Sequence, residues 1–273
     1  MFRARGSPSC TRHGVKLRLS TTARTRRLVG KAAVITGGTS GIRKRTAWLF
    51  VAHDARVVVA NIQDELGARL CAELGAPDVA SYVHRDVTVE ADVSAAVDHA
   101  VSRFVSLDVM FNNAGIGGAP CHSIRESDKA DFERVQEVSP MALSWGTKHA
   151  ARIMVPAGRD GCIIGTSSTS SAVVGGASHA YTLVGLTENA AAELGRHGIQ
   201  VNCGEAFEQA MEAVANLKGV RLSVDDIANA VLFFTSDDAR FISGHNLLIA
   251  AAVQIRTPYS TILKSIAAMT QKR

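Results

Sequence analysis

Short β-branched runs alternate with helical stretches from residue 32 onward, and this alternation leaves few possible folds. The strand-like runs are AAVIT (32–36), RVVVA (56–60), ASYVH (80–84), LDVMFN (107–112), CIIGTS (162–167), IQVNC (199–203) and NLLIA (246–250). The stretches between them predict helices over 41–53, 64–74, 90–104, 128–154, 182–197, 205–217 and 224–236. Strands that alternate with helices of this length form parallel sheets with right-handed crossovers. We therefore expect an α/β protein with a doubly wound parallel sheet of about seven strands and helices on both faces.

The basic residues are concentrated at the N-terminus. Residues 1–31 hold seven Arg, two Lys and no acid, so the other residues carry 21 basic against 25 acidic groups. An Arg- and Ser-rich, acid-poor head of this kind is typical of organelle targeting peptides. We predict a mitochondrial presequence over 1–26, with a plastid transit peptide or a disordered terminus on a cytoplasmic protein as the alternatives.

The remaining 247 residues suit one large domain, because the chain is 47% apolar and shows no internal repeat or linker. We place this domain at 27–250 and a C-terminal tail at 251–273. The tail carries four apolar residues on one side of a possible helix, which would dock on the domain or on a second subunit: Ile262, Leu263, Ile266 and Met269.

Several classes of site lack the residues they need. The basic run RTRRLVGK has no accompanying aromatic or second basic stripe, which argues against a nucleic-acid partner. The five cysteines lie far apart, without a C-x-x-C pair, and no histidine pair has zinc-site spacing, so we expect reduced thiols and no metal. No run reaches 18 apolar residues, so we expect no membrane span.

The first strand ends in a glycine-rich turn, TGGTSGIRKRTA (36–47). Such a strand, turn and helix presents backbone N–H groups and the positive helix end to a diphosphate. Any tight turn between a strand and a helix also uses glycine, so Gly37 and Gly41 alone are weak indicators. Arg43 occupies the third glycine position of the usual pattern, where its bulk should weaken dinucleotide binding although its charge could pair with phosphate.

The second strand ends at Asn61, where dinucleotide-binding proteins usually have an acidic residue for the adenosine ribose. Asparagine still bonds a hydroxyl group but without the strength of a carboxylate. We expect NAD as cofactor, with NADP less favoured. Asp64 and Glu65 are predicted to be first-turn residues of the next helix rather than ribose ligands.

Six motifs in order resemble the short-chain dehydrogenase/reductase family: TGGTSGI, HRDVT, DVMFNNAGI, a serine thirteen residues before a tyrosine, ELGRHGIQVN and DDIANAVLF with SDDARFISGHNLLI. The resemblance covers about residues 28–250. It is greatest to the plant branch that includes secoisolariciresinol dehydrogenases, momilactone A synthases and xanthoxin dehydrogenases. It implies a Rossmann-like domain, an NAD(P) cofactor, a small-molecule substrate and homo- or hetero-oligomers of such subunits.

Residue by residue, the resemblance assigns the adenine side to Asp86 and Val87 and the cofactor cleft after the fourth strand to Asn112 and the residues that follow it. The complete set of implied cofactor contacts is Gly37, Ser40, Gly41, Ile42, Asn61, Asp86, Val87, Asn113, Ala114 and Gly115. Tyr181 takes the position of the proton-transferring tyrosine, and Ser168, thirteen residues earlier, that of the serine that orients the substrate oxygen. Ser167, Thr169 and Ser170 are neighbouring hydroxyls, so Ser168 rests on spacing alone.

No lysine follows Tyr181. In the family a lysine four residues later stabilises the tyrosinate and holds the nicotinamide ribose, but here that position is Gly185. Family members read along the lines of AYTASKHAVVGLTK where this chain reads AYTLVGLTE, so about five residues are missing. A five-residue gap in a continuous helix rotates Tyr181 by about 140° relative to the rest of the helix. Lys148, His149 and His179 are expected to be ordinary helix or loop residues rather than substitutes.

Three further departures accompany this gap. The helix asparagine of the proton relay falls at Ser139, and Pro140 disfavours helical geometry at the residue before it. The substrate lid after IQVNC is largely absent, and Ala250, Ala251 and Ala252 replace an Asp-Gly-Gly. A hydrolase triad is excluded because GTSST lacks the Gly-x-Ser-x-Gly elbow.

Three hypotheses follow. The first is an NAD(P)-dependent oxidoreductase of a CH–OH or ketone group on a small lipophilic metabolite, slowed by about 10²- to 10³-fold without the lysine. The second is a non-catalytic relative that acts as a subunit or binding partner. The third is a gene prediction that has lost coding segments.

Overall fold

Seven parallel strands form one sheet in the computed structural model, which describes residues 26–37, 39, 41–119, 125, 127–168, 178–206, 217 and 222–249. The spatial order is β3-β2-β1-β4-β5-β6-β7, and every neighbouring pair is parallel. The strands are β1 (Ala32–Thr36), β2 (Arg56–Asn61), β3 (Ala80–His84), β4 (Val109–Asn112), β5 (Gly161–Ser168), β6 (Ile199–Ala206) and β7 (Asn246–Ile249). This confirms the predicted fold class and the number of strands.

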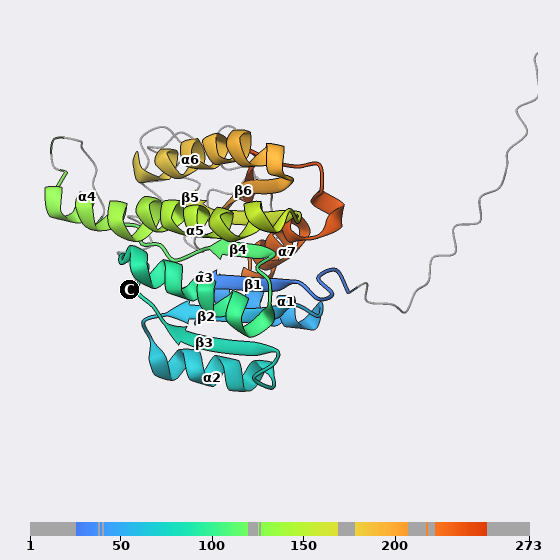
Figure 1. Cartoon of the computed structure of the whole chain (residues 1–273). Coiled ribbons are helices and arrows are strands. Elements are labelled where there is room, and N and C mark those ends of the chain that lie inside the picture. The colour runs from blue at the N-terminus through green and yellow to red at the C-terminus, as the bar shows by residue number, and fades with distance from the viewer. Residues whose placement is uncertain are drawn as a thin grey trace, which may run out of the picture.

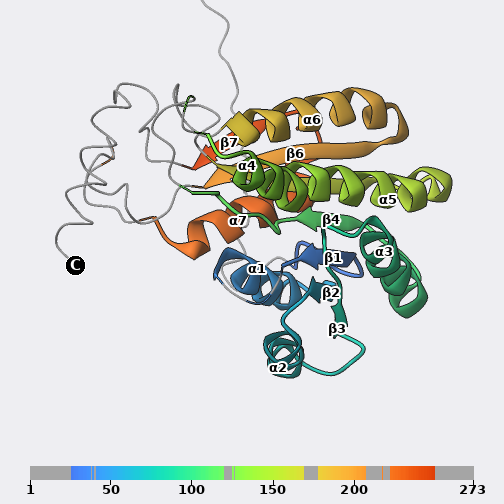
Figure 2. The ribbon, with the colours of Figure 1, turned by 90° about the vertical axis from the view of Figure 1, so that its left-hand side faces the viewer.

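Helices cover both faces of the sheet (Figure 1; Figure 2). On one face α1 (Gly41–Ala52), α2 (Asp64–Leu74) and α7 (Val224–Thr235) pack on alternate strand residues such as Ile35, Val59 and Phe111. On the other face α3 (Glu90–Phe104), α5 (Ala142–Ala157) and α6 (Ser178–Leu194) pack on the intervening residues such as Val34 and Met110. Because successive strand residues point to opposite faces, strands that are apolar throughout bury both faces.

The predicted helix over 128–154 is instead divided into three parts. Helix α4 (Lys129–Gln136) leads into a π-helical turn, η2 (Glu137–Met141), and then into α5. Pro140 lies inside the π-helical turn and lacks the N–H that an α-helical hydrogen bond needs. The expectation that Pro140 disfavours helical geometry at Ser139 was wrong, because the wider π-helical turn accommodates the proline and the helix continues through both residues.

Other boundaries differ by a few residues. Helix α6 begins at Ser178, four residues before the prediction, and its last predicted turn is a 3₁₀ turn, η4 (Gly195–His197). The predicted helix over 205–217 was wrong at its start, because residues 205 and 206 extend β6 beside β5. Residues 207–216 lie outside the described residues, as does the tail over 251–273.

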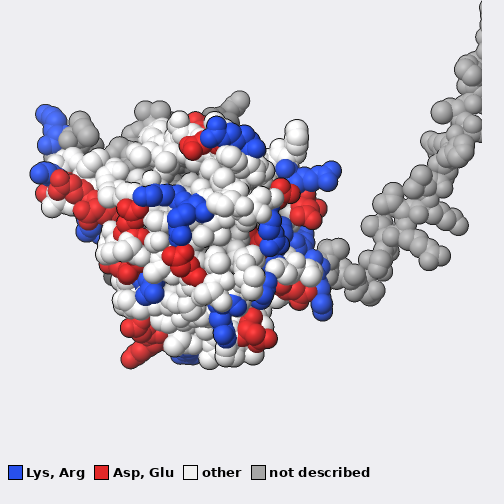
Figure 3. Space-filling model, viewed as in Figure 1, with Lys and Arg blue, Asp and Glu red and all other residues white. Residues whose placement is uncertain are grey.

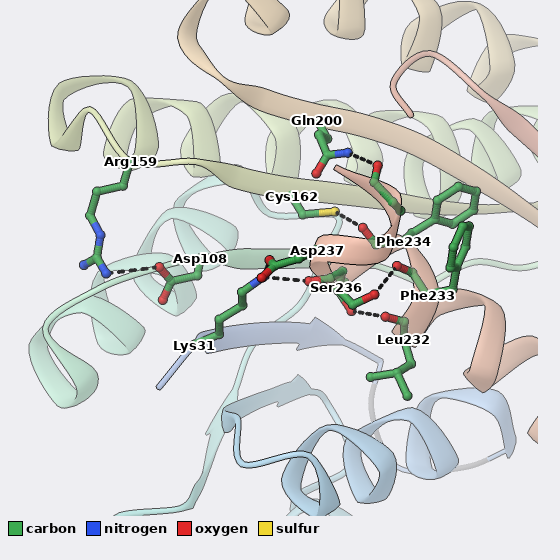
Figure 4. A network of polar contacts seen from close by, with 12 residues as sticks. Lys31, Asp108, Arg159, Cys162, Gln200, Leu232, Phe233, Phe234, Ser236 and Asp237 are labelled. Atoms are coloured by element: carbon green, nitrogen blue, oxygen red, sulfur yellow. Dashed lines mark hydrogen bonds and ion pairs between the residues drawn. The ribbon is translucent and has the colours of Figure 1, made fainter. Parts of the chain in front are cut away.

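Polar contacts at the amino ends of the strands hold α7 against the sheet (Figure 4). Lys31, just before β1, donates from Nζ to the carbonyl oxygen of Thr235 at 2.9 Å and pairs with Asp237 in the 3₁₀ turn η6 (Asp237–Ala239) at 3.4 Å. Cys162 Sγ on β5 donates to the carbonyl oxygen of Phe234 at 3.3 Å. A cation near carbonyl groups at a helix C-terminus is favourable, so these contacts fix the end of the molecule opposite the strand carboxyl ends.

The face over α3 and α5 carries charges of both signs rather than a single basic patch (Figure 3). Glu90 pairs with Lys148 at 2.6 Å, and Asp98 pairs with Arg152 at 2.7 Å. Within the described ranges, no helix is both long enough and apolar enough to cross a membrane.

Candidate functional site

The strand order reverses between β1 and β4, so the loops that follow these two strands diverge to opposite sides of the sheet. In open parallel sheets the crevice at the carboxyl ends of such strands is where ligands bind. The glycine-rich turn after β1 and the Asn-Asn-Ala-Gly segment after β4 lie at this point. The structure therefore brings most of the predicted cofactor residues to one edge of the sheet.

Thr36 joins the two loops, a role that we did not predict. Its side chain is buried, and its Oγ1 accepts hydrogen bonds from the backbone N–H of Asn113 at 3.0 Å and of Ala114 at 3.2 Å. Thr166 on β5 donates from Oγ1 to Asn113 Oδ1 at 3.0 Å. These bonds hold the segment after β4 against the end of β1. The available signal was the position of Thr36 as the first residue of the glycine motif.

Gly37 has a left-handed backbone with φ +72°, which favours glycine. A Cβ atom placed on Gly37 would lie 2.6 Å from Arg43 Nη1 and 3.2 Å from Ala114 Cα. The Arg43 guanidinium is therefore folded back over the turn instead of extending into solvent. Of the other predicted residues here, Gly41 (φ +54°) starts α1, Ile42 is half-buried, and Ser40 lies outside the described residues.

Asn61 is buried at the end of β2 and bonds within the protein. Its Nδ2 donates to Thr39 Oγ1 at 2.6 Å, and its Oδ1 accepts from Ile62 N at 2.8 Å. Thr39 Oγ1 in turn donates to Gln63 Oε1 at 2.8 Å. A carboxamide oxygen accepts two hydrogen bonds, so Asn61 Oδ1 keeps one lone pair for a ribose hydroxyl.

Asp64 begins α2, as predicted, and its carboxylate is engaged by two neighbours. Tyr82 Oη donates to Asp64 Oδ1 at 2.7 Å, and His84 Nδ1 lies 2.8 Å from the same oxygen. The hydrogen bond from Tyr82, then that from His84, lowers the pKa of Asp64. Burial, followed by the contact with Asp64, raises the pKa of Tyr82. This cluster supports the end of β2 and engages one of the two carboxylate oxygens of Asp64.

Asp86 and Val87 lie half-buried in the segment between β3 and α3. Asp86 Oδ1 accepts hydrogen bonds from Thr88 N at 2.9 Å and Thr88 Oγ1 at 2.8 Å, and Asp86 N donates to Asp92 Oδ2 at 2.9 Å. An aspartate that bonds the N–H two residues later forms an Asx turn. Asp86 therefore shapes the turn that would carry Val87 beside an adenine ring.

Ser139, in the π-helical turn, bonds the loop after β4 in both directions. Its Oγ accepts from Ile116 N at 3.1 Å and donates to Ile116 O at 3.3 Å. Ser139 was predicted only as the loss of an asparagine, but the structure gives it a positioning contact with the cleft. Asn112 is buried against Gly146 of α5, and neither polar atom of its carboxamide has a hydrogen-bond partner among the described residues. Gly115 is exposed beside Ser139. A Cβ atom added to Gly115 would lie 3.3 Å from Ser139 Oγ.

Tyr181 lies in the first turns of α6 and points away from the sheet. Its side chain is 48% exposed and forms no hydrogen bond with any residue of the described ranges. Among residues 181–194 of the same helix, the buried ones are Leu183, Thr187 and Leu194. Successive helix residues are about 100° apart, so Tyr181 lies about 160° from Leu183. Helix α6 is continuous over this stretch, as the argument about helical phase assumed.

Gly185 occupies the position of the expected lysine, and a Cβ atom added there would meet nothing within 4 Å. Lys148 instead pairs with Glu90 at 2.6 Å, and buried His149 lies 3.1 Å from the same carboxylate. The backbone of Ser168 ends β5, while its side chain and that of His179 lie outside what the structure describes. Lys148 is exposed on α5, whereas His149, which was expected on a helix surface or in a loop, is buried; both side chains contact Glu90 of α3.

Within the described part of the chain, Cys71, Cys162 and Cys203 form no disulfide, and burial raises the pKa of Cys162 to about 12. A search of the described residues finds no group of three or more His, Cys, Asp or Glu side chains arranged to hold a metal ion.

Comparisons with known proteins agree with this geometry. The family model for short chain dehydrogenase matches residues 31–206. Momilactone A synthase from Oryza sativa subsp. japonica is 58% identical over 254 residues, covering 84% of this chain and 92% of that protein. A mitochondrial borneol dehydrogenase from Lavandula x intermedia is 45% identical over 245 residues, covering 84% and 93%. A crystal structure of a short-chain type dehydrogenase/reductase from Mycobacterium marinum has a TM-score of 0.77 at 26% identity, covering 84% of this chain and 97% of that one.

The alignment with momilactone A synthase also shows that residues are missing here. It extends over 254 positions, whereas 84% of the 273 residues is about 229, so about 25 positions face a gap in this chain. This number exceeds the five residues inferred to be missing after Tyr181, so the gaps are not confined to that stretch. The sheet order, the glycine turn and the matched residues together establish that the chain belongs to the short-chain dehydrogenase/reductase family, in the plant branch that includes momilactone A synthase.

Proposed function

We propose that this chain is an NAD-dependent oxidoreductase that acts slowly on a secondary alcohol or ketone of a small lipophilic metabolite. The observation that carries the proposal is the meeting of the loops after β1 and β4, which Thr36 holds together by accepting hydrogen bonds from Asn113 and Ala114. The relatives support the substrate class, since borneol dehydrogenase is named for a small lipophilic alcohol.

The cleft residues fit a dinucleotide once Arg43 is taken into account. The glycine turn allows close approach of a ligand, and the first atom that a Cβ added to Gly37 would meet is Nη1, at the flexible, cationic end of Arg43. A cationic end that can move fits a diphosphate. Asn61 Oδ1 retains capacity for a ribose hydroxyl, and we favour NAD over NADP for this reason.

Bound NAD would supply the hydride acceptor. In the proposed reaction Tyr181 accepts the proton of the alcohol hydroxyl, and Ser168 orients the substrate oxygen. A free tyrosine has a pKa of about 10 and is a poor base near neutral pH without a nearby cation. Because no lysine follows and Tyr181 points away from the sheet, we expect turnover on the order of 10²- to 10³-fold below that of a complete site.

Reduction of NAD with borneol, followed by NADH absorbance, tests the proposal. We expect saturable NADH formation at well under about 1 s⁻¹, compared with about 10 s⁻¹ for a typical enzyme. The rate should fall further in Tyr181→Phe. Turnover near 10 s⁻¹ would disprove the impairment, and absence of both NAD binding and turnover would disprove the function.

A second candidate is a non-catalytic subunit that pairs with its own copies or with an active short-chain dehydrogenase. The exposed, unbonded Tyr181 is the observation that favours it. In this case NAD binding persists, turnover is zero in both wild type and Tyr181→Phe, and the chain co-purifies with an active subunit. Measurable turnover by a protein that purifies alone would exclude it.

We also propose that residues 1–26 direct the chain to mitochondria and that 27–250 form the domain. The Arg-rich head and the mitochondrial relative support this location. A fluorescent fusion of the full chain should co-localise with a mitochondrial marker, and the fusion without residues 1–26 should not. Signal in plastids or the cytoplasm from the full fusion would contradict the proposal.

A further inference from the structure

Arg43 differs from the two basic residues that follow it on α1. Lys44 pairs with Glu73 at 3.0 Å, and Arg45 pairs with Asp225. Arg43 forms neither a hydrogen bond nor an ion pair with any residue in the described part of the chain. Its side chain instead turns back toward the glycine-rich turn that precedes α1. A Cβ atom added to Gly37 in that turn would lie 2.6 Å from Arg43 Nη1 and 3.2 Å from Arg43 Cδ.

This placement is unfavourable for the protein alone. Arg43 is the third residue of α1, whose first turn contains no acidic residue, and a cation near a helix N-terminus is repelled by the helix dipole. Arg43 is also half-buried, and burial lowers its pKa because the charged form loses water contacts. A desolvated, unpaired guanidinium gains from an anion that enters the same space.

We propose that Arg43 is a phosphate-binding residue of the nucleotide site, whose guanidinium pairs with the diphosphate of a bound adenine nucleotide between Gly37 and Ala114. The inference rests on the proposed function, since it uses the same cleft. The attraction between the Arg43 charge and the diphosphate then compensates for the space that the ligand loses when a side chain replaces glycine at this position. The ligand class is a nucleotide that carries a diphosphate, rather than a nucleoside.

The test compares ADP with adenosine by calorimetry on the full chain, because the two probes differ only in the diphosphate. Variants Arg43→Ala and Arg43→Gln remove the charge, and Arg43→Gly restores the usual glycine. Arg45→Ala is the matched control, since it removes an equal charge from the same helix. Thermal unfolding of each variant checks that the fold is intact, and Arg43→Gln preserves most of the side-chain volume if Arg43→Ala is unstable.

We expect Arg43→Ala and Arg43→Gln to weaken ADP binding by about tenfold or more, because the loss of a hydrogen bond between charged groups lowers affinity by about this factor. Adenosine affinity should stay within about twofold, and Arg45→Ala should leave both probes unchanged. The affinity of wild type for ADP should also fall more steeply with salt than that of Arg43→Ala.

Three outcomes would overturn the inference. Equal or tighter ADP binding by Arg43→Ala or Arg43→Gly would show that Arg43 obstructs the site, and the proposed function would survive. An equal loss of affinity for ADP and for adenosine would show that the substitution acts through the structure and not through the diphosphate. Failure of wild type and Arg43→Gly to bind ADP or NAD at all would refute both the inference and the proposed function.

Discussion

Inserting five residues, Ala-Ser-Lys-His-Ala, between Thr182 and Leu183 should turn Tyr181 toward the sheet and place a lysine four positions after it. Five residues rotate the preceding turn by about 500°, which equals about 140°. Tyr181 would then lie about 20° from the direction of buried Leu183 instead of about 160°. Residues four apart are neighbours on a helix, so the ammonium would lie beside the tyrosine hydroxyl.

The expected gain in turnover depends on both the rotation of Tyr181 and the added ammonium. If the ammonium lowers the pKa of a neighbouring tyrosine by about two to three units, the rate constant for proton transfer rises by about 10²- to 10³-fold. The assay is the rate of NADH formation from borneol in a single turnover with saturating NAD. We expect an increase on the order of 10²-fold over wild type.

Two variants separate rotation from charge. The insertion Ala-Ser-Ala-His-Ala rotates Tyr181 without adding an ammonium, and Gly185→Lys adds an ammonium without rotation. The space around Gly185 accepts a side chain, and replacing a helix glycine should stabilise the fold by about 0.5–1 kcal/mol, so Gly185→Lys should remain folded. Each variant alone should stay within about tenfold of wild type. A Gly185→Lys variant as active as the full insertion would refute the argument about helical phase, and a folded full insertion with no gain would refute the role given to Tyr181.

The remaining predictions concern stability. Thr36→Val should lower the free energy of unfolding by about 1–3 kcal/mol, because the buried N–H of Asn113 and the partly buried N–H of Ala114 lose their acceptor; urea unfolding measures this, and a loss under about 0.5 kcal/mol would contradict it. Ser223→Ala should cost about 1 kcal/mol by removing the capping box of α7, and Ser223→Asp, which can still cap, should recover most of it. The hydrogen bond from Tyr82 lowers the pKa of Asp64 in the folded protein. This bond therefore contributes its full stability above about pH 4, and the contribution is lost as the pH falls through the lowered pKa of Asp64. Tyr82→Phe should therefore show a weaker decline of unfolding temperature below about pH 4 than wild type, and identical declines would count against this contact.

Much of the fold was predictable from the sequence because local signals agreed with the tertiary structure. The bounds of α2 and α3 were predicted residue for residue, since acidic first turns and apolar periodicity mark both helices. The extension of β6 to residue 206 was not, because pairing with β5 decides it rather than local propensity. The π-helical turn around Pro140 likewise depends on how the helix accommodates a missing N–H.

The candidate site shows the same division. Glycine spacing and the Asn-Asn-Ala-Gly segment located the strand ends that meet at Thr36, and the rotation inferred from the missing residues after Tyr181 stays a prediction. The direction of the Arg43 side chain and the role of Thr36 were not predictable, because each depends on contacts between segments far apart in the chain. Sequence spacing places residues at an edge of the sheet, but only packing decides which polar atoms remain available to a ligand.

We expect the loops after β1 and β4 to bind a dinucleotide although Tyr181 is exposed and has no lysine four residues later. Calorimetric titration of NAD into the full chain tests this expectation. Binding should be saturable with one site per chain, and Thr36→Val should weaken it while Tyr181→Phe leaves it unchanged. Absence of binding at millimolar NAD, in wild type and in Arg43→Gly alike, would contradict it.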